Sequence, residues 1–299
     1  MLTIVLKVLI MMFIGIILSE ILIELDFNIK WNFVRFANLP SACNTPFVIA
    51  FASTISADAM LQTLKENGML RDYEVILSSM LNSTANWIRE TITYIIPVVI
   101  PILGVKIGLI YTATLWFSVL TTLTFVIIAG KFLNKNVEIS FEIRNKSINK
   151  KNKKRDFKNA ITRALRRFRR IAIVYITATI VSMLVVKNVN IDLLNGIANV
   201  FSISSYAIPA LVAYVASPIV GMSMVASMLG NGIICERDAI VTIILGSTLA
   251  LPIFYVRSFI PKWVSIFGFK VGVIRGLLDL SIKIITRIIV LMLVLAIFS

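Results

Sequence analysis

The nine residues ILGVKIGLI, from Ile102 to Ile110, return as IFGFKVGVI, from Ile266 to Ile274, in a chain of 299 residues. The shift from Ile102 to Ile266, here called the repeat offset, is a little over half of the chain, so a duplicated unit should carry the match further. Without a gap, 17 of the 59 positions from 52 to 110 are identical to the positions at the repeat offset. Shared apolar composition explains scattered Ile and Leu matches, but not paired Asn-Gly, Ser-Thr, Pro and Gly-x-Lys-x-Gly. The sequence therefore predicts an internal repeat.

The composition is typical of a membrane protein. Hydrophobic residues make up 58% of the chain, charged residues make up 15%, and the mean hydropathy is +0.92. The segment from Leu193 to Cys235 is uncharged for 43 residues, whereas about 20 helical residues suffice to cross a bilayer core. We expect this segment to fold back at least once. The apolar stretch from Met1 to Leu25 lacks a following cleavage site and is interpreted as a first membrane helix.

Several kinds of chemistry are not expected. The chain has no histidine, which removes the commonest general base and the commonest zinc ligand. Cys43 and Cys235 form neither a disulfide framework nor a metal-binding spacing. We expect no cofactor, no metal site and no enzyme activity, because no pair of nucleophile and base is evident.

Half of the positive charge lies in one segment. Between Lys131 and Arg170 there are 15 of the 30 Lys and Arg residues, against three acidic residues, in a chain with a net charge of +15. Nucleic-acid binding is compatible with such a run, but a cytoplasmic loop between membrane spans is the favoured interpretation, and nucleic acid is not expected as a partner. Phe157, Ile161 and Leu165 share one helical face, so this part would suit an anionic leaflet.

The repeat can be threaded through a membrane in two ways. The predicted divisions are a first membrane repeat at 1–133, the basic cytoplasmic linker with its amphipathic helix at 134–170, and a second membrane repeat at 171–299. Each half contains a segment rich in small residues, from Phe51 to Met60 and from Val215 to Met224. If this segment crosses the membrane, the repeats are parallel. If it is a re-entrant or broken hairpin, each half has about three transmembrane helices and the repeats are inverted. With the linker inside, loop Lys and Arg residues divide 8 inside to 5 outside for inverted repeats, and 4 to 9 for parallel repeats.

The positive-inside rule favours the inverted arrangement, with both termini outside. We therefore expect an all-α, multi-pass protein of the cell membrane with two inverted repeats. One feature of the last helix is harder to place in this membrane arrangement. Charged residues form a stripe there, recurring every four residues on one face, at Arg275, Asp279, Lys283 and Arg287. It is interpreted as either interfacial or facing a wet cavity.

Asp58 is the candidate ion-coupling residue. It lies in FASTISADAM, from Phe51 to Met60, whose small residues also suit close helix packing. A carboxylate within the membrane layer is costly, and it usually serves as a counter-ion or proton site. Its repeat counterpart is Met222, as expected for an asymmetric site that takes a proton or sodium ion. A surface position near the hairpin mouth is the alternative.

Polar residues of the hairpins and of the following helices are the candidate substrate-binding set. The duplicated pairs Ser83-Thr84 and Ser247-Thr248 would reach matching depth from opposite directions in inverted repeats. The full set is Asn82, Ser83, Thr84, Ser217, Ser223, Asn231, Ser247 and Thr248.

These motifs resemble the Gate or nucleoside-recognition domain family. That family includes concentrative nucleoside transporters, the membrane part of bacterial ferrous-iron transporters, and spore maturation membrane proteins. The resemblance covers 38–132 and 202–299, and it rests on the turns at Asn67-Gly68 and Asn231-Gly232 and on the Ser-Thr pairs of the polar helices. It implies paired hairpin-plus-helix units and a nucleoside-like or ionic solute.

Two functions are expected from these features. The first is secondary transport of a small polar or anionic solute, by alternating access at a site between the repeats. The alternative is a non-transporting membrane scaffold or lipid-handling protein whose basic linker binds a partner or anionic lipid. Membrane lipids and a small solute are the expected partners, and a homo-oligomer is left open.

Overall fold

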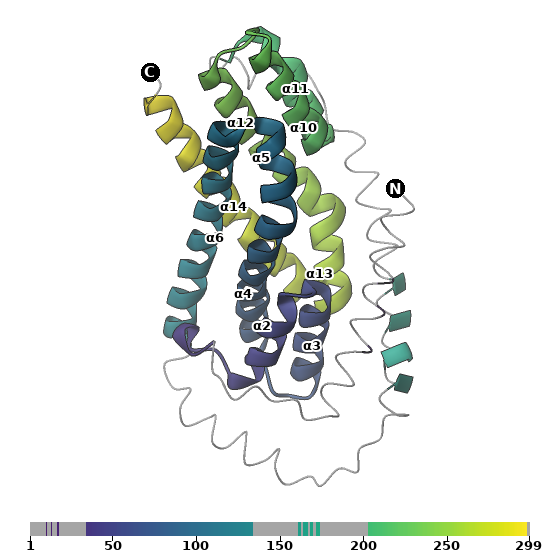
Figure 1. Cartoon of the computed structure of the whole chain (residues 1–299). Coiled ribbons are helices and arrows are strands. Elements are labelled where there is room, and N and C mark those ends of the chain that lie inside the picture. Colours follow the sequence, from purple (N-terminus) through teal and green to yellow (C-terminus); the bar gives the residue numbers. More distant parts are fainter. Residues whose placement is uncertain are drawn as a thin grey trace. The chain divides into compact units, whose positions relative to one another are not determined.

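Every regular element in the described part of this computed structural model is a helix (Figure 1). The structure describes residues 34–133 and 203–297, with isolated positions at 10, 13 and 17 and between 161 and 173. The first stretch contains η1 (Arg35–Ala37), η2 (Ser41–Cys43), α2 (Asn44–Ala50), α3 (Thr54–Glu66), α4 (Asp72–Glu90), η3 (Thr91–Val99), α5 (Ile100–Leu103) and α6 (Val105–Leu133). The second contains η4 (Ser205–Ala207), α10 (Ile208–Ala216), α11 (Pro218–Gly230), α12 (Glu236–Phe254), η5 (Tyr255–Phe259), α13 (Ile260–Phe267) and α14 (Phe269–Ile297). The predicted all-α class is confirmed for these residues.

Three helical stretches are long and apolar enough to cross a membrane. They are Val105–Leu133, Glu236–Phe267 and Phe269–Ile297, with 29, 32 and 29 residues. At about 1.5 Å per residue, each exceeds the roughly 30 Å of a bilayer core. These helices support membrane association. The expected helices at 1–25 and 171–186, and most of the basic linker, lie outside the described residues.

The helix bounds recur at the offset seen in the sequence. Helices α3 and α11, α4 and α12, and α6 and α14 each begin and end at positions related by the repeat offset. Gly68 and Gly232 share a positive φ, as do Gly104 and Gly268. Local structure and sequence therefore follow the same period.

The Asn-Gly turns end α3 and α11 as predicted. Gly68 has φ +74° and Gly232 has φ +68°, a backbone region that glycine enters without steric cost. After the first turn, Glu74 accepts a hydrogen bond from the backbone N–H of Arg71 at 2.7 Å. Acidic residues also occupy the first turn of α12, where the helix dipole favours negative charge.

The segment at 102–110 and its repeat at 266–274 each form a sharp turn between two helices, α5 and α6 or α13 and α14, and this turn with its flanking helices is here called the corner. Helix α4 continues directly into the π-helical segment η3, which contains Pro97, and then into α5, which ends at Leu103. In the second half, α12 continues into the π-helical segment η5 and then into α13, which contains Pro261 and ends at Phe267. The helix therefore does not end at the prolines. The reversal comes at Gly104, which has φ +75° and ψ 160°, and at Gly268 in the second half.

The hairpin helices pack through small residues. Ala50, Ala57 and Ala85 are fully buried together in one cluster, and α2 packs along α3 (Figure 1). In the second half, Gly221 of α11 faces the backbone of Tyr214 in α10. Helices α3 and α11 have 13 residues each, or about 20 Å, which is shorter than a bilayer core.

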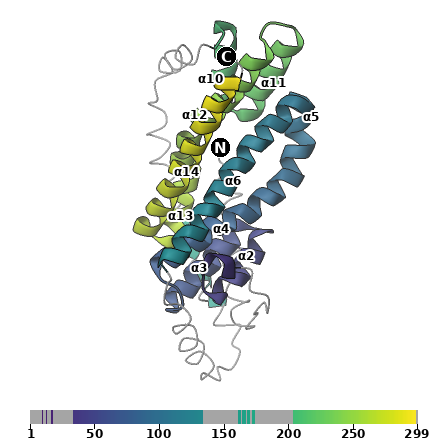
Figure 2. The same ribbon diagram turned by 90° about the vertical axis from the view of Figure 1, so that its left-hand side faces the viewer.

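Contacts divide the chain into two compact units, here called unit 1 and unit 2. Apart from the isolated positions, which fall in unit 1, the described part of unit 1 is 34–89, 122–133 and 260–276, and that of unit 2 is 90–121, 203–259 and 277–297. Within unit 1, α13 packs against α3. Within unit 2, α5 packs against α11 (Figure 2). Each unit therefore combines the hairpin of one half with the corner of the other.

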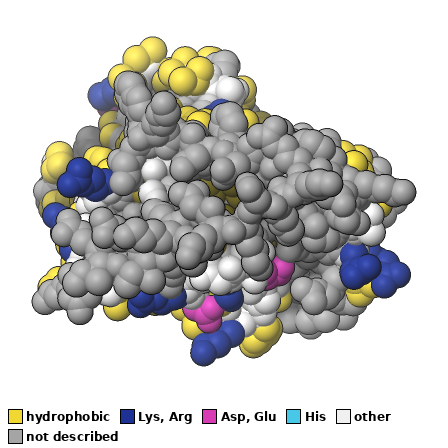
Figure 3. Space-filling view, turned by 90° about the horizontal axis from the view of Figure 1, so that it is seen from below, with side chains coloured by type: hydrophobic (Ala, Val, Ile, Leu, Met, Phe, Trp, Pro, Cys, Tyr) yellow, Lys and Arg dark blue, Asp and Glu magenta, His cyan; other side chains and the backbone are white. Residues whose placement is uncertain are grey.

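Charged side chains occur both on the surface and in the interior. Figure 3 shows Lys and Arg side chains at several separate places on one face, with Asp and Glu in a smaller area. Partly exposed pairs such as Lys65 with Asp72, at 2.8 Å, contribute little to stability. A second set of charged residues is buried, and burial makes an unpaired charge costly. The buried set therefore defines the candidate sites.

Candidate functional site

Asp58 lies inside unit 1. Its side chain projects from α3 and is 2% exposed, which excludes the surface alternative. Its Oδ2 accepts a hydrogen bond from Nε1 of Trp263 at 3.3 Å, whereas Oδ1 has no hydrogen-bond partner among the described residues. The Ser79 hydroxyl also lies near the carboxylate, although its geometry makes no hydrogen bond to Oδ1. The carboxylate thus keeps one acceptor oxygen available.

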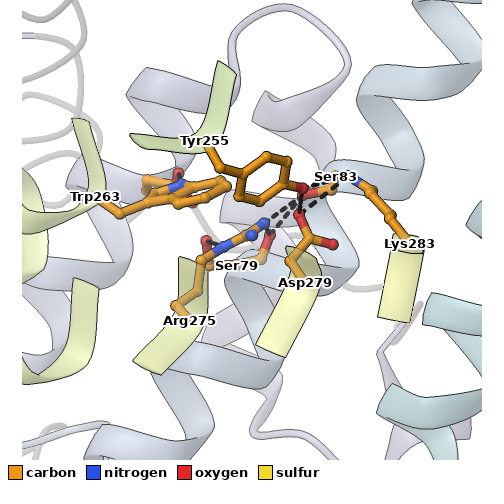
Figure 4. A network of polar contacts seen from close by, with 8 residues as sticks. Ser79, Ser83, Tyr255, Trp263, Arg275, Asp279 and Lys283 are labelled. Atoms are coloured by element: carbon orange, nitrogen blue, oxygen red, sulfur yellow. Dashed lines mark hydrogen bonds and ion pairs between the residues drawn. The ribbon is translucent and has the colours of Figure 1, made fainter. Parts of the chain in front are cut away.

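Arg275 is the buried cation of the same unit. It is 1% exposed and reaches from α14 to α4 (Figure 4). Its Nε donates to the hydroxyl of Ser79 at 3.1 Å, and its Nη2 donates to the Ser79 carbonyl at 3.3 Å and to the Ser83 hydroxyl at 2.5 Å. The guanidinium carbon lies 3.6 Å from the ring centroid of Trp263. Arg275 is therefore held by hydrogen bonds and by an aromatic face.

The charges of this cluster compensate one another. Arg275 and Lys262 act electrostatically on Asp58, so the buried carboxylate and guanidinium offset each other's cost of leaving water. Trp263 contacts both Asp58 and Arg275. A proton or cation gained by Asp58 would therefore change the electrostatic balance at Arg275.

The predicted residues Asn82, Ser83 and Thr84 of unit 1 lie on α4, and Ser83 joins this cluster. Ser83 accepts from Arg275. Asn82 is 1% exposed, and its Nδ2 has no partner in the described part of the chain. Thr84 instead donates to the backbone carbonyl of Leu81 at 2.7 Å. Asn82 thus retains a polar group for a ligand, whereas the hydroxyls of Ser83 and Thr84 both donate to carbonyls of their own helix, that of Ser83 to Ser79 at 3.3 Å.

A second cluster lies inside unit 2. The hydroxyl of Tyr255 donates to Oδ2 of Asp279 at 2.6 Å. Nζ of Lys283 lies 3.0 Å from the same oxygen and 2.9 Å from the Tyr255 hydroxyl (Figure 4). All three residues are buried. Their burial argues against an interfacial position for this part of the stripe, because interfacial side chains would reach solvent.

The predicted residues of unit 2 separate into a buried group and an exposed group. Ser247 and Thr248 are buried, and both hydroxyls donate to the carbonyl of Ile244 at 2.8 Å. Ser223 is exposed, as is Asn231 in the turn after α11. Ser217 is half-buried just before α11 and makes no capping hydrogen bond. The hydroxyls of the Ser-Thr pair are therefore used within α12, whereas the Ser247 carbonyl accepts a hydrogen bond from another helix.

Sequence reasoning did not assign several residues of these clusters. Trp263, Tyr255 and the hydrogen-bonded pair of Tyr111 and Tyr214, at 2.8 Å, were not singled out. Positions at which the two repeats differ could have indicated these residues. At the repeat offset, Val99 corresponds to Trp263 and Tyr111 corresponds to Arg275. The same kind of difference singled out Asp58.

No metal centre is evident among the described residues. No group of three His, Cys, Asp or Glu side chains comes together there in a way that could hold a metal ion. The buried chemistry of both units consists of carboxylates, cations, hydroxyls and aromatic rings. Such groups suit the binding of protons, ions and polar solutes.

Comparisons with known proteins give relatives without an assigned function. The chain is 22% identical over 308 residues to "Uncharacterized protein MJ0880" of Methanocaldococcus jannaschii, covering 98% of this chain and 97% of that protein. It is 28% identical over 277 residues to "Uncharacterized protein MJ1556" of the same organism, covering 88% and 85%. "Uncharacterized protein MJ0871" is 27% identical over 240 residues, covering 78% and 73%. No family model matches the chain, and no solved structure matches it.

Proposed function

We propose that this chain is a multi-pass secondary transporter built from two inverted repeats. The equal separations of α3 from α11, α4 from α12 and α6 from α14 support a duplicated unit. The short helices of each hairpin support re-entrant segments, since about 20 residues are needed for a full crossing. Each repeat would then contribute about three transmembrane helices and one hairpin, and both would take part in alternating access.

The buried Asp58 is the observation that carries this proposal. A carboxylate with a free acceptor oxygen, beside a buried arginine, is suited to gain and lose a proton or sodium ion. When Asp58 is neutralised, the charge of Arg275 loses its compensation and attracts an anion. Binding a proton together with an anion keeps the buried charge constant, which lowers the desolvation cost of both. Asp58 is thus the proposed coupling residue.

The solute is proposed to be small and polar or anionic. Asn82 supplies a buried amide without a partner among the described residues, and the next residue, Ser83, accepts a hydrogen bond from Arg275 in unit 1. Membership of the Gate or nucleoside-recognition family is part of the proposal, supported by the Asn-Gly turns and Ser-Thr pairs. A nucleoside-like solute is therefore tested beside small anions.

The test is a transport assay with purified protein in proteoliposomes. Nucleosides, nucleobases, inorganic phosphate and small carboxylates are supplied under separate proton and sodium gradients, and internal pH and labelled solute are followed. We expect saturable uptake of one class driven by one gradient. Asp58→Asn should lose gradient-driven uptake, whereas Asp72→Asn, at an exposed acid of the same unit, should keep it.

Two results would contradict the proposal. Uptake by Asp58→Asn with unchanged dependence on both gradients would remove Asp58 from coupling. Folded wild-type protein that transports nothing in the panel would favour the scaffold or lipid-handling alternative. Deleting linker residues 146–158 and measuring vesicle binding would then test that alternative directly.

A further inference from the structure

Arg287 is a buried arginine in unit 2 that has few partners. It projects from α14 and is 5% exposed. Its Nη1 donates to the carbonyl oxygen of Ser247, whereas its Nε is buried with no hydrogen-bond partner among the residues that the structure describes. Arg275 differs, since it makes three hydrogen bonds and stacks on an aromatic ring. The guanidinium of Arg287 is therefore the less satisfied of the two.

The charge of Arg287 is also less compensated. Asp279 pairs with Lys283, Asp238 with Arg237, and no described acidic residue forms an ion pair with Arg287. Lys283 lies one helical turn before Arg287, and like charges at this spacing repel. A buried cation without a partner costs free energy, which an incoming anion would offset.

Two tyrosines add further donors near the same place. The ring of Tyr214 lies against Gly246 of α12, because a β-carbon added to Gly246 would lie 2.9 Å from Cγ of Tyr214. The residue after Gly246 is Ser247, whose carbonyl accepts the hydrogen bond from Arg287. The charge of Arg287 acts on Tyr214, whose hydroxyl shares one hydrogen bond with Tyr111 at 2.8 Å. Because two hydroxyls carry two protons and share one bond, one O–H remains to donate.

We propose that Arg287, Tyr214 and Tyr111 form a binding site for an oxyanion group, either a carboxylate or a phosphate. Surplus donors, positive charge and few acceptors are what such a group requires, and the arginine fork matches its paired oxygens. This inference rests on the proposed function, because it gives an anionic solute a second binding position, in unit 2, in addition to Arg275 of unit 1. It also makes a claim about binding that needs no transport.

The test measures binding through stability. Full-length protein in detergent is unfolded by heat while tryptophan fluorescence is followed, with acetate, inorganic phosphate or glycerol 3-phosphate added at constant ionic strength. A ligand that binds only the folded protein raises Tm in a saturable way. Acetate reports a carboxylate, inorganic phosphate reports a free phosphate, and glycerol 3-phosphate reports a lipid-headgroup phosphate.

We expect at least one oxyanion to raise the Tm of the wild type. Arg287→Gln should lose this rise and, without oxyanion, should melt no lower than the wild type, because it removes an uncompensated charge. Arg287→Lys should require about tenfold more oxyanion, since lysine lacks the fork. Lys106→Gln, at an exposed cation of the same unit, should match the wild type.

The proposal is overturned if no oxyanion raises the wild-type Tm, or if Arg287→Gln shows the wild-type rise. If Arg287→Gln does not fold, an unchanged half-saturating concentration in both Arg287→Lys and Tyr214→Phe overturns it. The two proposals fail separately. A saturable rise in Tm without any uptake supports the oxyanion site and contradicts the transporter proposal. Proton-driven uptake without a rise in Tm supports the transporter and contradicts the oxyanion site.

Discussion

A β-carbon at Gly221 would lie 2.3 Å from the Cα of Tyr214. Helices α10 and α11 therefore approach each other at a distance that only glycine allows. The equivalent position in the first half is Ala57, which is fully buried beside Ala50. The hairpin of unit 2 is thus packed backbone against backbone, and this packing fixes the position of the Tyr214 side chain.

Gly221→Ala should destabilise the protein strongly. The added methyl group meets backbone atoms, so a helix must move, and such overpacking costs about 1–3 kcal/mol. Gly230→Ala is the matched control in the same helix, since nothing lies within 4 Å of its β-carbon. Thermal unfolding in detergent should show a lower Tm for the first variant only. Equal Tm values would show that α10 and α11 separate easily.

Arg275→Lys should weaken unit 1 although the charge is kept. Lysine cannot reproduce the three hydrogen bonds and the flat contact with Trp263. Leaving buried acceptors unsatisfied costs about 1–3 kcal/mol. Arg71→Lys, at an exposed arginine of the same unit, should change stability by less than about 1 kcal/mol. Similar losses in both variants, measured by denaturant unfolding, would argue against the structural role of Arg275.

The buried pair of Asp279 and Lys283 should behave as a coupled unit. Lys283→Met alone leaves a buried carboxylate without its cation and should cost about 3–5 kcal/mol. Adding Asp279→Leu should recover part of this loss, with a coupling of about 0.5–3 kcal/mol. A double-mutant cycle on unfolding free energies measures the coupling. Strict additivity would show that the two charges are stabilised independently.

Gly104→Ala should strain the corner after α5. The backbone at Gly104 has φ +75° and ψ 160°, a region occupied almost only by glycine, and other residues there cost about 1–3 kcal/mol. Gly104→Asn should give no rescue. Asparagine tolerates the left-handed helical region, as Asn38 does here at φ 49° and ψ 33°, but that is a different region. An Asn variant as stable as the wild type would contradict this explanation.

Cysteine labelling should decide between inverted and parallel repeats. Lys106 and Lys270 are both exposed and stand at equivalent positions of the two corners. In a Cys235→Ser background, we expect an impermeant maleimide to label Lys106→Cys from outside and Lys270→Cys from inside. Labelling of both from outside would support the parallel arrangement and remove the inverted one.

Much of the local structure could be predicted from the sequence. The Asn-Gly turns, the acidic first turns of α4 and α12 and the small-residue hairpins follow from short-range sterics and from the helix dipole. The repeat offset correctly anticipated equivalent helix bounds in the two halves. These features depend on neighbouring residues, so a single sequence records them.

The side-chain partners could not be predicted in the same way. Arg275 meets Ser79 across 196 residues of sequence, and Trp263 meets Asp58 across 205. No periodicity encodes contacts between segments so far apart. The four-residue spacing of the charged stripe marked Arg275 and Arg287 as unusual, but it could not tell which one has a full set of partners. Only the packing of α14 against α4 and α12 distinguishes them.

Each compact unit takes its hairpin from one half of the chain and its corner from the other, with α13 on α3 and α5 on α11. A chain cut within residues 134–170 would yield two fragments, and neither would contain all the helices of either unit. Each fragment would need the other in order to fold, as subunits do in a domain-swapped dimer. The linker then acts as a covalent tether, which replaces the association of two subunits by a reaction within one molecule. A protein of half this length with the same local structure would therefore have to associate with a second copy to complete either unit.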